Sequence, residues 1–404
     1  MSAALSDILI LDLSRVLAGP YATMLLGDLG ARIIKVEQPG GGDDTRRWGP
    51  PFTANGESAY FFAANRNKES VTIDLKTAAG RQLLLDLARQ ADVLVENFKV
   101  GTLDRLGLGY SSLCEVNPGL VYCSVTGYGQ TGPYRHRPGY DTAIQAQGGL
   151  MSITGPPDST DAEGEPYKVG VAVVDVTAGL HAALAILAAL HHRTRTGEGQ
   201  SIDIALFDVQ LSWLVNVASA YLVSGVPPQR YGNAHASIVP YQTMPTADGW
   251  LMLAVGNDSQ FAALCQALGC PALAQDERFA TNPARVAHRT TLIPLLEAWF
   301  RTQPTAVWTE RLPAANVPCS PVNDIPTALA DPQAVARTMV QSIEHPVTGS
   351  IPQLGPVPKL SRTPAQIRSA PPLLGEQTAS VLADLLGFDA EQIEQLRRVG
   401  AIGT

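Results

Sequence analysis

The sequence predicts an α/β protein with two parts: a Rossmann-like large domain built on a parallel sheet, and a smaller α+β domain. Three observations support this prediction. The chain has 404 residues, more than one simple core accommodates. In its first half, short apolar segments alternate with helix-length amphipathic segments, as in βαβ units. From about residue 226 to 325, that alternation gives way to a hairpin pattern followed by helices.

Five strands are expected in the first half, because apolar and β-branched residues cluster there in short runs. They lie at 7–13, 31–37, 71–75, 93–98 and 120–129. Helical spacing of apolar residues predicts helices at 20–30 and 77–92. Pro20 suits the first position of a helix, where the missing N–H costs no hydrogen bond. Helices of this length form crossover connections, so the strands are expected to be parallel.

The second half continues the alternation and then changes character. A helix is expected at about 176–189, a strand at 200–208, a long apolar helix at 209–225, a hairpin at 241–256, and two closing helices in EQTASVLADLLG and DAEQIEQLRRVG. The sequence Ala247-Asp248-Gly249 marks the hairpin turn. We therefore predict a large-domain segment at 1–200, a linker helix at 201–225, a small domain at 226–325 and a C-terminal return to the large domain at 326–404.

The composition indicates a soluble globular protein with large buried surfaces, and the cysteines indicate a reducing compartment. The chain is 45% hydrophobic but only 16% charged, which favours an oligomer that hides part of its surface. A net charge of −8 without a basic cluster argues against nucleic acid as a partner. Five scattered cysteines form no CxxC pair and are expected to be reduced thiols. The first residues lack the basic region of a signal peptide and the length of a membrane span, so we expect a cytoplasmic protein without membrane contact.

Several common catalytic signatures are missing. The first strand is followed by SRVLAGP rather than GxGxxG, and the chain contains no GxxxxGK[ST], GxSxG or HExxH. The sequence therefore predicts neither a nicotinamide dehydrogenase, nor a serine hydrolase, nor a metal site. GGGDD at 40–44 is either a flexible loop or an anion-binding turn.

One carboxylate stands inside an apolar run. Asp175 lies in VGVAVVDVTAG, and an ionised carboxylate is costly to bury unless it is paired, hydrogen-bonded or used. Asp175 or Thr177 is a candidate N-cap for the helix expected at 176–189. A role for Asp175 in chemistry is the alternative, and the two are compatible.

Ordered motifs along nearly the whole chain resemble those of class III CoA-transferases, the family of formyl-CoA transferase and CaiB/BaiF proteins. The motifs are ILDLSRVLAGPYATMLLGDLGARIIKVEQPGGGDDTR, ANRNKESVTIDLK, DVLVENFKVGTLDRLGLGY, SVTGYGQTGPY, VPCSPVND and PPLLGEQT. GDDTRRWGPPF and AHASIVPYQT further resemble the succinyl-CoA:glutarate CoA-transferase branch. The resemblance implies an interlocked homodimer, CoA esters as substrates and no permanently bound cofactor.

The resemblance also implies a catalytic role for Asp175, which occupies the position of the family's catalytic aspartate. Its carboxylate is expected to attack an acyl-CoA thioester, giving an aspartyl–acyl anhydride and then an aspartyl–CoA thioester. A carboxylate is a weak nucleophile, but covalent catalysis divides one difficult exchange into easier steps. An apolar environment protects the anhydride from water.

Matching positions imply which residues bind CoA. They are Val16, Leu17, Gln38, Ile73, Lys76, Asn97, Phe98, Lys99 and Arg105. Arg105 is a candidate phosphate ligand because guanidinium groups suit phosphate geometry. Leu17 replaces the glutamine of formyl-CoA transferase, and Gln38 replaces an arginine.

A larger acid than formate or oxalate is expected as the acceptor. AVGNDSQF at 254–261 lacks the four-glycine run of formyl-CoA transferase, although a short lid there is possible. The distal carboxylate of a dicarboxylic acid requires a cation or strong donor. The candidates for acid recognition are Arg15, Arg47, Trp48, Tyr140, His235 and Ser237. Glutarate, itaconate, citramalate and malate all remain open as acceptors, with succinyl-CoA the expected donor.

Two other functions are considered. A racemase of 2-methylacyl-CoA esters shares the family's fold, but Thr126 stands where racemases have a histidine. A CoA-ester-binding protein without turnover would not need Asp175.

Overall fold

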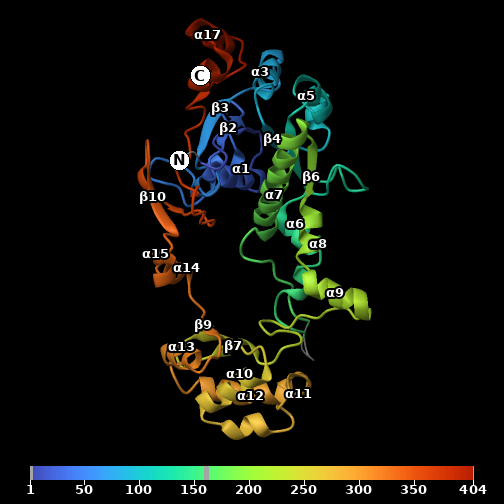
Figure 1. The fold of residues 1–404 in the computed structure, drawn as a ribbon, viewed down its shortest axis with the longest axis vertical. Coiled ribbons are helices and arrows are strands. Elements are labelled where there is room, and N and C mark those ends of the chain that lie inside the picture. Colours follow the sequence, from blue (N-terminus) through green and yellow to red (C-terminus); the bar gives the residue numbers. More distant parts are fainter. Residues whose placement is uncertain (1–2, 159–162, 404) are drawn as a thin grey trace. The chain divides into compact units, whose positions relative to one another are not determined.

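The computed structural model describes residues 3–158 and 163–403, which divide into two compact units (Figure 1). The first unit spans Met1–Leu150, Val169–Ser219 and Pro332–Thr404. The second spans Met151–Lys168 and Ala220–Asp331. The domain boundaries drawn from the sequence stay a prediction, and each unit is described by itself below.

A six-stranded parallel sheet forms the centre of the first unit. Its strands are β1 (Leu9–Asp12), β2 (Arg32–Glu37), β3 (Lys68–Thr72), β4 (Val93–Glu96), β5 (Val121–Thr126) and β6 (Ser201–Ala205). Their order is β3-β2-β1-β4-β5-β6, the doubly wound order of a Rossmann fold. The predicted α/β fold class is therefore confirmed. The central strands β1 and β4 are buried on both faces, which explains their nearly continuous apolar sequences, whereas β6 is partly exposed.

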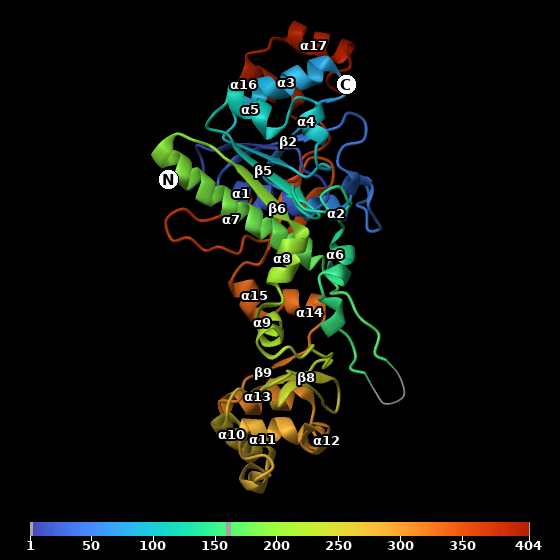
Figure 2. The same cartoon turned by 90° about the vertical axis from the view of Figure 1, so that its right-hand side faces the viewer.

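Helices cover both faces of this sheet (Figure 2). One face packs against α1 (Ala18–Asp28), α6 (Asp141–Gln147), α7 (Val173–Thr196) and α8 (Leu206–Ser212). The other packs against α3 (Ala78–Ala88), α4 (Thr102–Arg105), α5 (Tyr110–Val116), α16 (Thr378–Leu386) and α17 (Ala390–Arg398). Alternate residues of β1 point to opposite faces of the sheet. Ile10 packs in the apolar cluster on the first face, and Leu11 packs in the cluster on the other face.

The C-terminal segment protects the edge of the sheet. The backbone N–H of Ser70 donates to Gln377 Oε1 at 2.8 Å, and that of Thr72 donates to Thr378 Oγ1 at 3.1 Å. These contacts occupy donors that an edge strand otherwise leaves open to other chains. The same segment contains an antiparallel hairpin of β10 (Val340–His345) and β11 (Gly349–Leu354).

Three predicted helices differ in extent from those observed. α1 begins at Ala18, so Pro20 occupies the third helical position rather than the first. α7 begins at Val173 and ends at Thr196, longer at both ends than the segment expected at 176–189. The helix expected at 209–225 is wrong as one element, because α8 ends at Ser212 and α9 runs from Val215 to Ser224. Val215 has a φ of 28°, outside the helical region, so the chain bends there.

In the part of the chain that the structure describes, α7 is long and apolar enough to cross a membrane, as is the bent pair α8 and α9 if taken as one span. α7 nevertheless buries Ala178, Ala182 and Ile186 within the first apolar cluster. One side of α7 thus packs as a core helix against the sheet, while Leu180 and Leu184 are exposed.

The second unit is a small α+β structure. Its three-stranded antiparallel sheet contains β7 (Tyr241–Pro245), β8 (Trp250–Ala254) and β9 (Cys319–Pro321). Pro245 pairs with Trp250, which places the turn at 246–249, as the sequence predicts. Its helices include α10 (Asp258–Leu268), α11 (Asn282–Ala287), α12 (Arg289–Phe300) and α13 (Thr305–Ala314).

Candidate active site

The first unit has a cavity at the point where its strand order reverses. Connections from β1 and β4 leave the sheet in opposite directions, and ligands bind at such crevices outside the carboxyl ends of the strands. The cavity has a volume of about 220 Å³. Its lining includes Arg15, Val16, Leu17, Asn97, Phe98, Lys99, Tyr140 and Asp175. Sequence motifs far apart along the chain therefore meet around the predicted nucleophile.

Asp175 reaches the cavity from the first turn of α7. It is not the N-cap of that helix, nor is Thr177, because the cap position is Ala172, which offers no side-chain acceptor. The prediction of an Asp175 or Thr177 cap is therefore wrong. The physical reason is that the helix begins three residues earlier than the sequence pattern suggests, at Val173 rather than 176, which places both residues inside it.

Asp141 supplies the missing cap from α6. Its Oδ2 accepts the backbone N–H of Val174 at 2.8 Å and that of Asp175 at 3.2 Å. Its Oδ1 accepts Gln145 Nε2 at 2.6 Å, while Gln145 Oε1 accepts the N–H of Val169 at 2.9 Å. The Asp141 and Gln145 side chains therefore fix both the approach to α7 and its first turn.

The surroundings of Asp175 favour its protonated form. Burial raises the pKa of this half-buried carboxyl, and the negative charge of Asp141 raises it further, to about 7. The charges of Asp175 and Asp141 also act on Tyr60, which lies on α2 (Ala59–Phe62). Burial raises the pKa of its phenol, and the charge of Asp175 adds to that effect. A carboxylate with a raised pKa is more basic, and more nucleophilic when ionised, than one in water.

A second cavity, of about 260 Å³, lies beside the first and shares Arg15 and Phe98 with it. Gln38, Ile73 and Lys76 line this second cavity. Every predicted CoA-binding residue except Arg105 lines one of the two cavities. Arg105 is exposed on α4 and donates to Thr102 Oγ1 at 3.2 Å.

The candidates for acid recognition are distributed differently. Arg15 and Tyr140 line the cavity of Asp175, where the Arg15 guanidinium lies 3.2 Å from Asp44 Oδ2. Arg47 and Trp48 lie at the end of the short 3₁₀ helix Asp44–Arg47, outside the lining of either cavity. Trp48 contacts the ring of Tyr60 edge to face, with 5.2 Å between ring centroids.

His235 and Ser237 lie in the second unit, on the loop before β7. The backbone N–H of Ser237 donates to His235 Nδ1 at 3.1 Å, and the His235 ring contacts Tyr241 at 5.5 Å between centroids. The segment 254–261 lies in the same unit. There Asn257 caps α10 by accepting the N–H of Gln260 at 2.9 Å. The predicted lid stays a prediction.

Several residues that were not predicted to belong to the site also line the cavity. Arg135, His136 and Arg137 follow the carboxyl end of β5 and face the same space as Asp175. Their position after a buried strand was a usable signal, because the ends of parallel strands meet at one edge of a sheet. Thr126, at the end of β5, lines the cavity as well. The sequence around Asp141 does not indicate its capping role, because the helix that it caps begins 32 residues later.

Within residues 3–158 and 163–403, no three His, Cys, Asp or Glu side chains gather as a metal site. The five cysteines are free thiols. The polar side chains that line the cavity are carboxylates, guanidinium groups, the Lys99 ammonium, the His136 imidazole, an amide and hydroxyls. Such a set binds anionic ligands and can supply one buried carboxylate as a nucleophile.

Comparisons with known proteins agree with this arrangement. Residues 5–378 match the model of CoA-transferase family III. The succinate–glutarate CoA-transferase of Agrobacterium fabrum is 49% identical over 391 residues, covering 94% of this chain and 95% of its own. The succinyl-CoA:glutarate CoA-transferase of Mus musculus is 44% identical over 398 residues, covering 98% of this chain and 90% of its own.

Among solved structures, a CaiB/BaiF family protein from Brucella suis is similar in both fold and sequence. It superposes with a TM-score of 0.84 at 46% identity, covering 95% of this chain and all of that one. The agreement extends over the whole chain rather than over the Rossmann-like unit alone. This chain belongs to CoA-transferase family III.

Proposed function

We propose that this enzyme transfers CoA from succinyl-CoA to a dicarboxylic acid, with glutarate the first acceptor to test. The observation that carries the proposal is the half-buried Asp175 carboxylate in the first turn of α7, within a cavity lined by predicted CoA-binding residues. The names of the Agrobacterium fabrum and Mus musculus relatives support this choice of donor and acceptor. Itaconate, citramalate and malate are the alternative acceptors.

In the proposed reaction, a carboxylate oxygen of Asp175 attacks the thioester carbonyl. The C–S bond breaks, giving a mixed anhydride on Asp175 and a CoA thiolate. The thiolate then attacks the Asp175 carbonyl carbon, releasing succinate and leaving CoA as a thioester on the enzyme. An acceptor carboxylate attacks that thioester and forms a second anhydride with Asp175. The released thiolate then attacks the acceptor's carbonyl, and Asp175 is regenerated.

The environment of Asp175 suits this sequence of steps. Its raised pKa reflects a carboxylate that water and cations stabilise poorly, which makes the ionised form reactive. The positive end of the α7 dipole favours negative charge developing near its first turn.

The residues around Asp175 divide by role. We assign CoA contacts to Val16, Leu17, Gln38, Ile73, Lys76, Asn97, Phe98, Lys99 and Arg105. Among the candidates for the acceptor's distal carboxylate, Arg15 is favoured because it faces the cavity as a cation. Tyr140 lines the same space, while Arg47, Trp48, His235 and Ser237 stay candidates. We further propose a cytoplasmic enzyme that acts as an interlocked homodimer and uses CoA esters only as substrates.

The test is mass spectrometry of CoA esters after the enzyme is mixed with succinyl-CoA and a panel of dicarboxylic acids. New CoA esters of one or a few acids are expected. Asp175→Ala should abolish them, and it should also remove the covalent CoA adduct expected in the mass of the intact protein. Asp208→Ala is the matched control, because Asp208 lies in the first turn of α8 but is exposed. It should retain transfer.

The opposite outcome distinguishes the alternatives. If no acid acquires CoA, the proposed transfer is wrong. Deuterium exchange at the α-carbon of 2-methylacyl-CoA esters would then identify a racemase. Tight binding of CoA esters without either reaction would identify a binding protein.

A further inference from the structure

The turn that follows β1 is fixed by side chains from three other segments of the chain. The carbonyl of Ser14 accepts Lys35 Nζ at 3.0 Å. The N–H of Arg15 donates to Asn97 Oδ1 at 2.9 Å, and the carbonyl of Arg15 accepts Asn97 Nδ2 at 2.7 Å. This turn carries Arg15, Val16 and Leu17 along the cavity of Asp175. Its conformation therefore sets part of the shape of that cavity.

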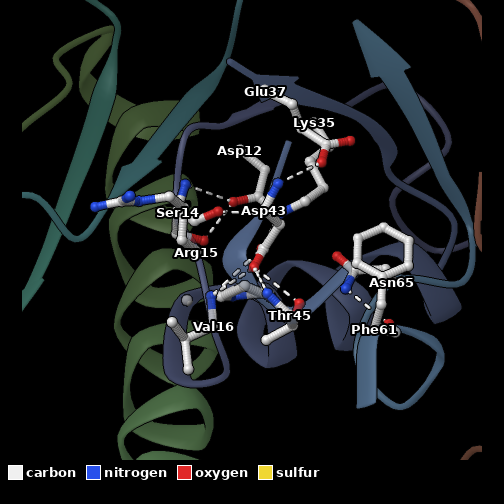
Figure 3. Close-up of polar contacts among 12 residues, drawn as sticks. Asp12, Ser14, Arg15, Val16, Lys35, Glu37, Asp43, Thr45, Phe61 and Asn65 are labelled. Carbon is white, nitrogen blue, oxygen red and sulfur yellow. Dashed lines mark hydrogen bonds and ion pairs between the residues drawn. The ribbon is translucent and has the colours of Figure 1, made fainter. Parts of the chain in front are cut away.

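Val16 is the strained residue of this turn. Its φ is 71°, in the left-handed region that a β-branched side chain rarely adopts. Its N–H points at both carboxylate oxygens of Asp43, at 3.2 and 3.3 Å (Figure 3). Asp43 Oδ1 also accepts the N–H and Oγ1 of Thr45, at 3.0 and 2.8 Å. One carboxylate therefore holds the strained residue and the loop opposite it together.

Two buried charged side chains, those of Lys35 and Glu37, in turn hold Asp43 in place. Its Oδ2 lies 2.9 Å from Lys35 Nζ, and both side chains are fully buried. Its backbone N–H donates to Glu37 Oε2 at 2.9 Å. Burial alone raises the pKa of Asp43, but the charge of Lys35 and the Thr45 N–H outweigh that effect and leave it below its usual value. The pair therefore remains ionised in the folded protein.

Stability alone is a poor explanation for such a pair, because apolar replacements of buried ion pairs are often neutral or stabilising. The position of the Lys35–Asp43 pair offers a better explanation. Lys35 Nζ bonds both Asp43 and the Ser14 carbonyl, so this pair of charges contacts both ends of the strained turn. Asp12 Oδ1 adds a further contact by accepting the Ser14 N–H at 3.0 Å. Figure 3 shows Asp43 between the Lys35 side chain and the backbone of Val16.

We propose that Lys35 and Asp43 form a positioning pair, which holds the Ser14–Val16 turn in the left-handed conformation that the CoA-ester cavity requires. Neither side chain lines the cavity of Asp175, whereas both line the second cavity. Hydrogen exchange of the turn and rescue by Val16→Gly therefore have to separate an action through the turn from a direct contact with CoA. The effect on the rate of transfer rests on the proposed function. The effects on the turn and on CoA binding do not.

The test compares Asp43→Asn with Asp28→Asn. Asp28 forms a buried pair with Arg66 at 2.7 Å, in the same unit but away from both cavities, so it is a matched control for the loss of a buried carboxylate. Three quantities are measured below the melting temperature of each variant: amide hydrogen exchange of the peptide containing residues 14–18, the Kd of CoA by calorimetry, and kcat/KM with succinyl-CoA and glutarate.

In Asp43→Asn, the turn amides should exchange at least about tenfold faster. The Kd of CoA should rise, and kcat/KM should fall, each by at least about tenfold. Asp28→Asn should leave the turn amides and the Kd near their wild-type values. Adding Val16→Gly to Asp43→Asn should recover part of the CoA affinity, because glycine adopts a positive φ without a Cβ clash. A purely global loss of stability would not respond to that second change.

The proposal is overturned if Asp43→Asn matches Asp28→Asn in exchange and CoA affinity, or if exchange rises while CoA affinity is unchanged. If Asp43→Asn fails to fold, Lys35→Met with Asp43→Leu removes both charges together and must show the same losses. If wild-type protein binds CoA but transfers it to no acid, the proposed function fails. The exchange and Kd comparisons still decide the role of the pair.

Discussion

At the scale of single residues, the central feature is a carboxylate that the fold keeps in a costly environment. Asp175 lies between apolar neighbours, is half-buried, and has a second carboxylate close to its backbone. Burial and Asp141 both raise its pKa, to about 7. The same features that make the ionised group reactive make it destabilising, and this relation leads to two predictions.

Replacing Asp141 by Asn should move the pH dependence of transfer. The substitution keeps an oxygen that accepts the α7 N–H groups but removes the like charge, so the pKa of Asp175 should fall. The acid limb of the kcat/KM profile should shift to lower pH by about half a unit to one unit. Burial remains, so the pKa should stay above 3.8. An acid limb that stays in place or moves to higher pH would contradict this account.

Replacing Asp175 by Asn should stabilise the folded protein at high pH. The folded-state pKa lies above that of the unfolded chain, so folding favours the protonated form and the free energy of unfolding falls as pH rises from about 4 to about 7. Asn has no such titration. At pH 8 the variant should be more stable by about 1–4 kcal/mol, and the difference should shrink toward pH 4. Urea unfolding at both pH values measures it, with Asp208→Asn expected to show no such pattern.

At the scale of elements, the site depends on the close approach of two helices beneath the sheet. A Cβ atom placed on Gly179 of α7 would lie 2.7 Å from the backbone carbonyl of Ala18, the first residue of α1. That approach brings the turn before α1 and the first turn of α7 to one cavity. Neither helix is positioned by its own sequence alone.

Gly179→Ala should therefore lower stability and weaken CoA binding together. Overpacking against backbone costs about 1–3 kcal/mol, which outweighs the roughly 1 kcal/mol by which Ala improves on Gly in a helix. Thermal unfolding and CoA calorimetry measure both effects. Gly170→Ala is the control, since a Cβ there meets nothing within 4 Å. An unchanged melting temperature in Gly179→Ala would show that the two helices separate without cost.

At the scale of the whole molecule, large apolar side chains are exposed at neighbouring positions of one helix. On α9, Leu222 is 80% exposed and Val223 is 87% exposed. Only 16% of the residues are charged. Contiguous apolar surface of this kind marks an interface, and this supports the proposed homodimer.

The protein should accordingly have twice the chain mass of 42.8 kDa in solution. Light scattering after size exclusion measures this directly. Leu222→Lys should lower the fraction of dimer recovered after refolding, because a charge cannot be buried there without a partner. A wild-type protein that remains monomeric at micromolar concentration would contradict the proposed assembly.

Local patterns were enough to predict much of this protein. The apolar runs at 31–37 and 93–98 became β2 and β4, and the helix expected at 77–92 corresponds to α3. Motif resemblance identified the family, and with it Asp175 as the candidate nucleophile. These features depend on residues close together in sequence, or on ordered motifs that survive without knowledge of three-dimensional contacts.

Only the tertiary structure decided which side chains support that nucleophile. Asp141 caps α7 across 33 residues of chain, and Asp43 reaches Val16 across 27. Neither contact has a local signature, because each depends on the sheet bringing the carboxyl ends of separate strands to one edge. The left-handed Val16 is likewise unexpected from sequence, since a β-branched residue adopts that conformation only when distant partners hold it there.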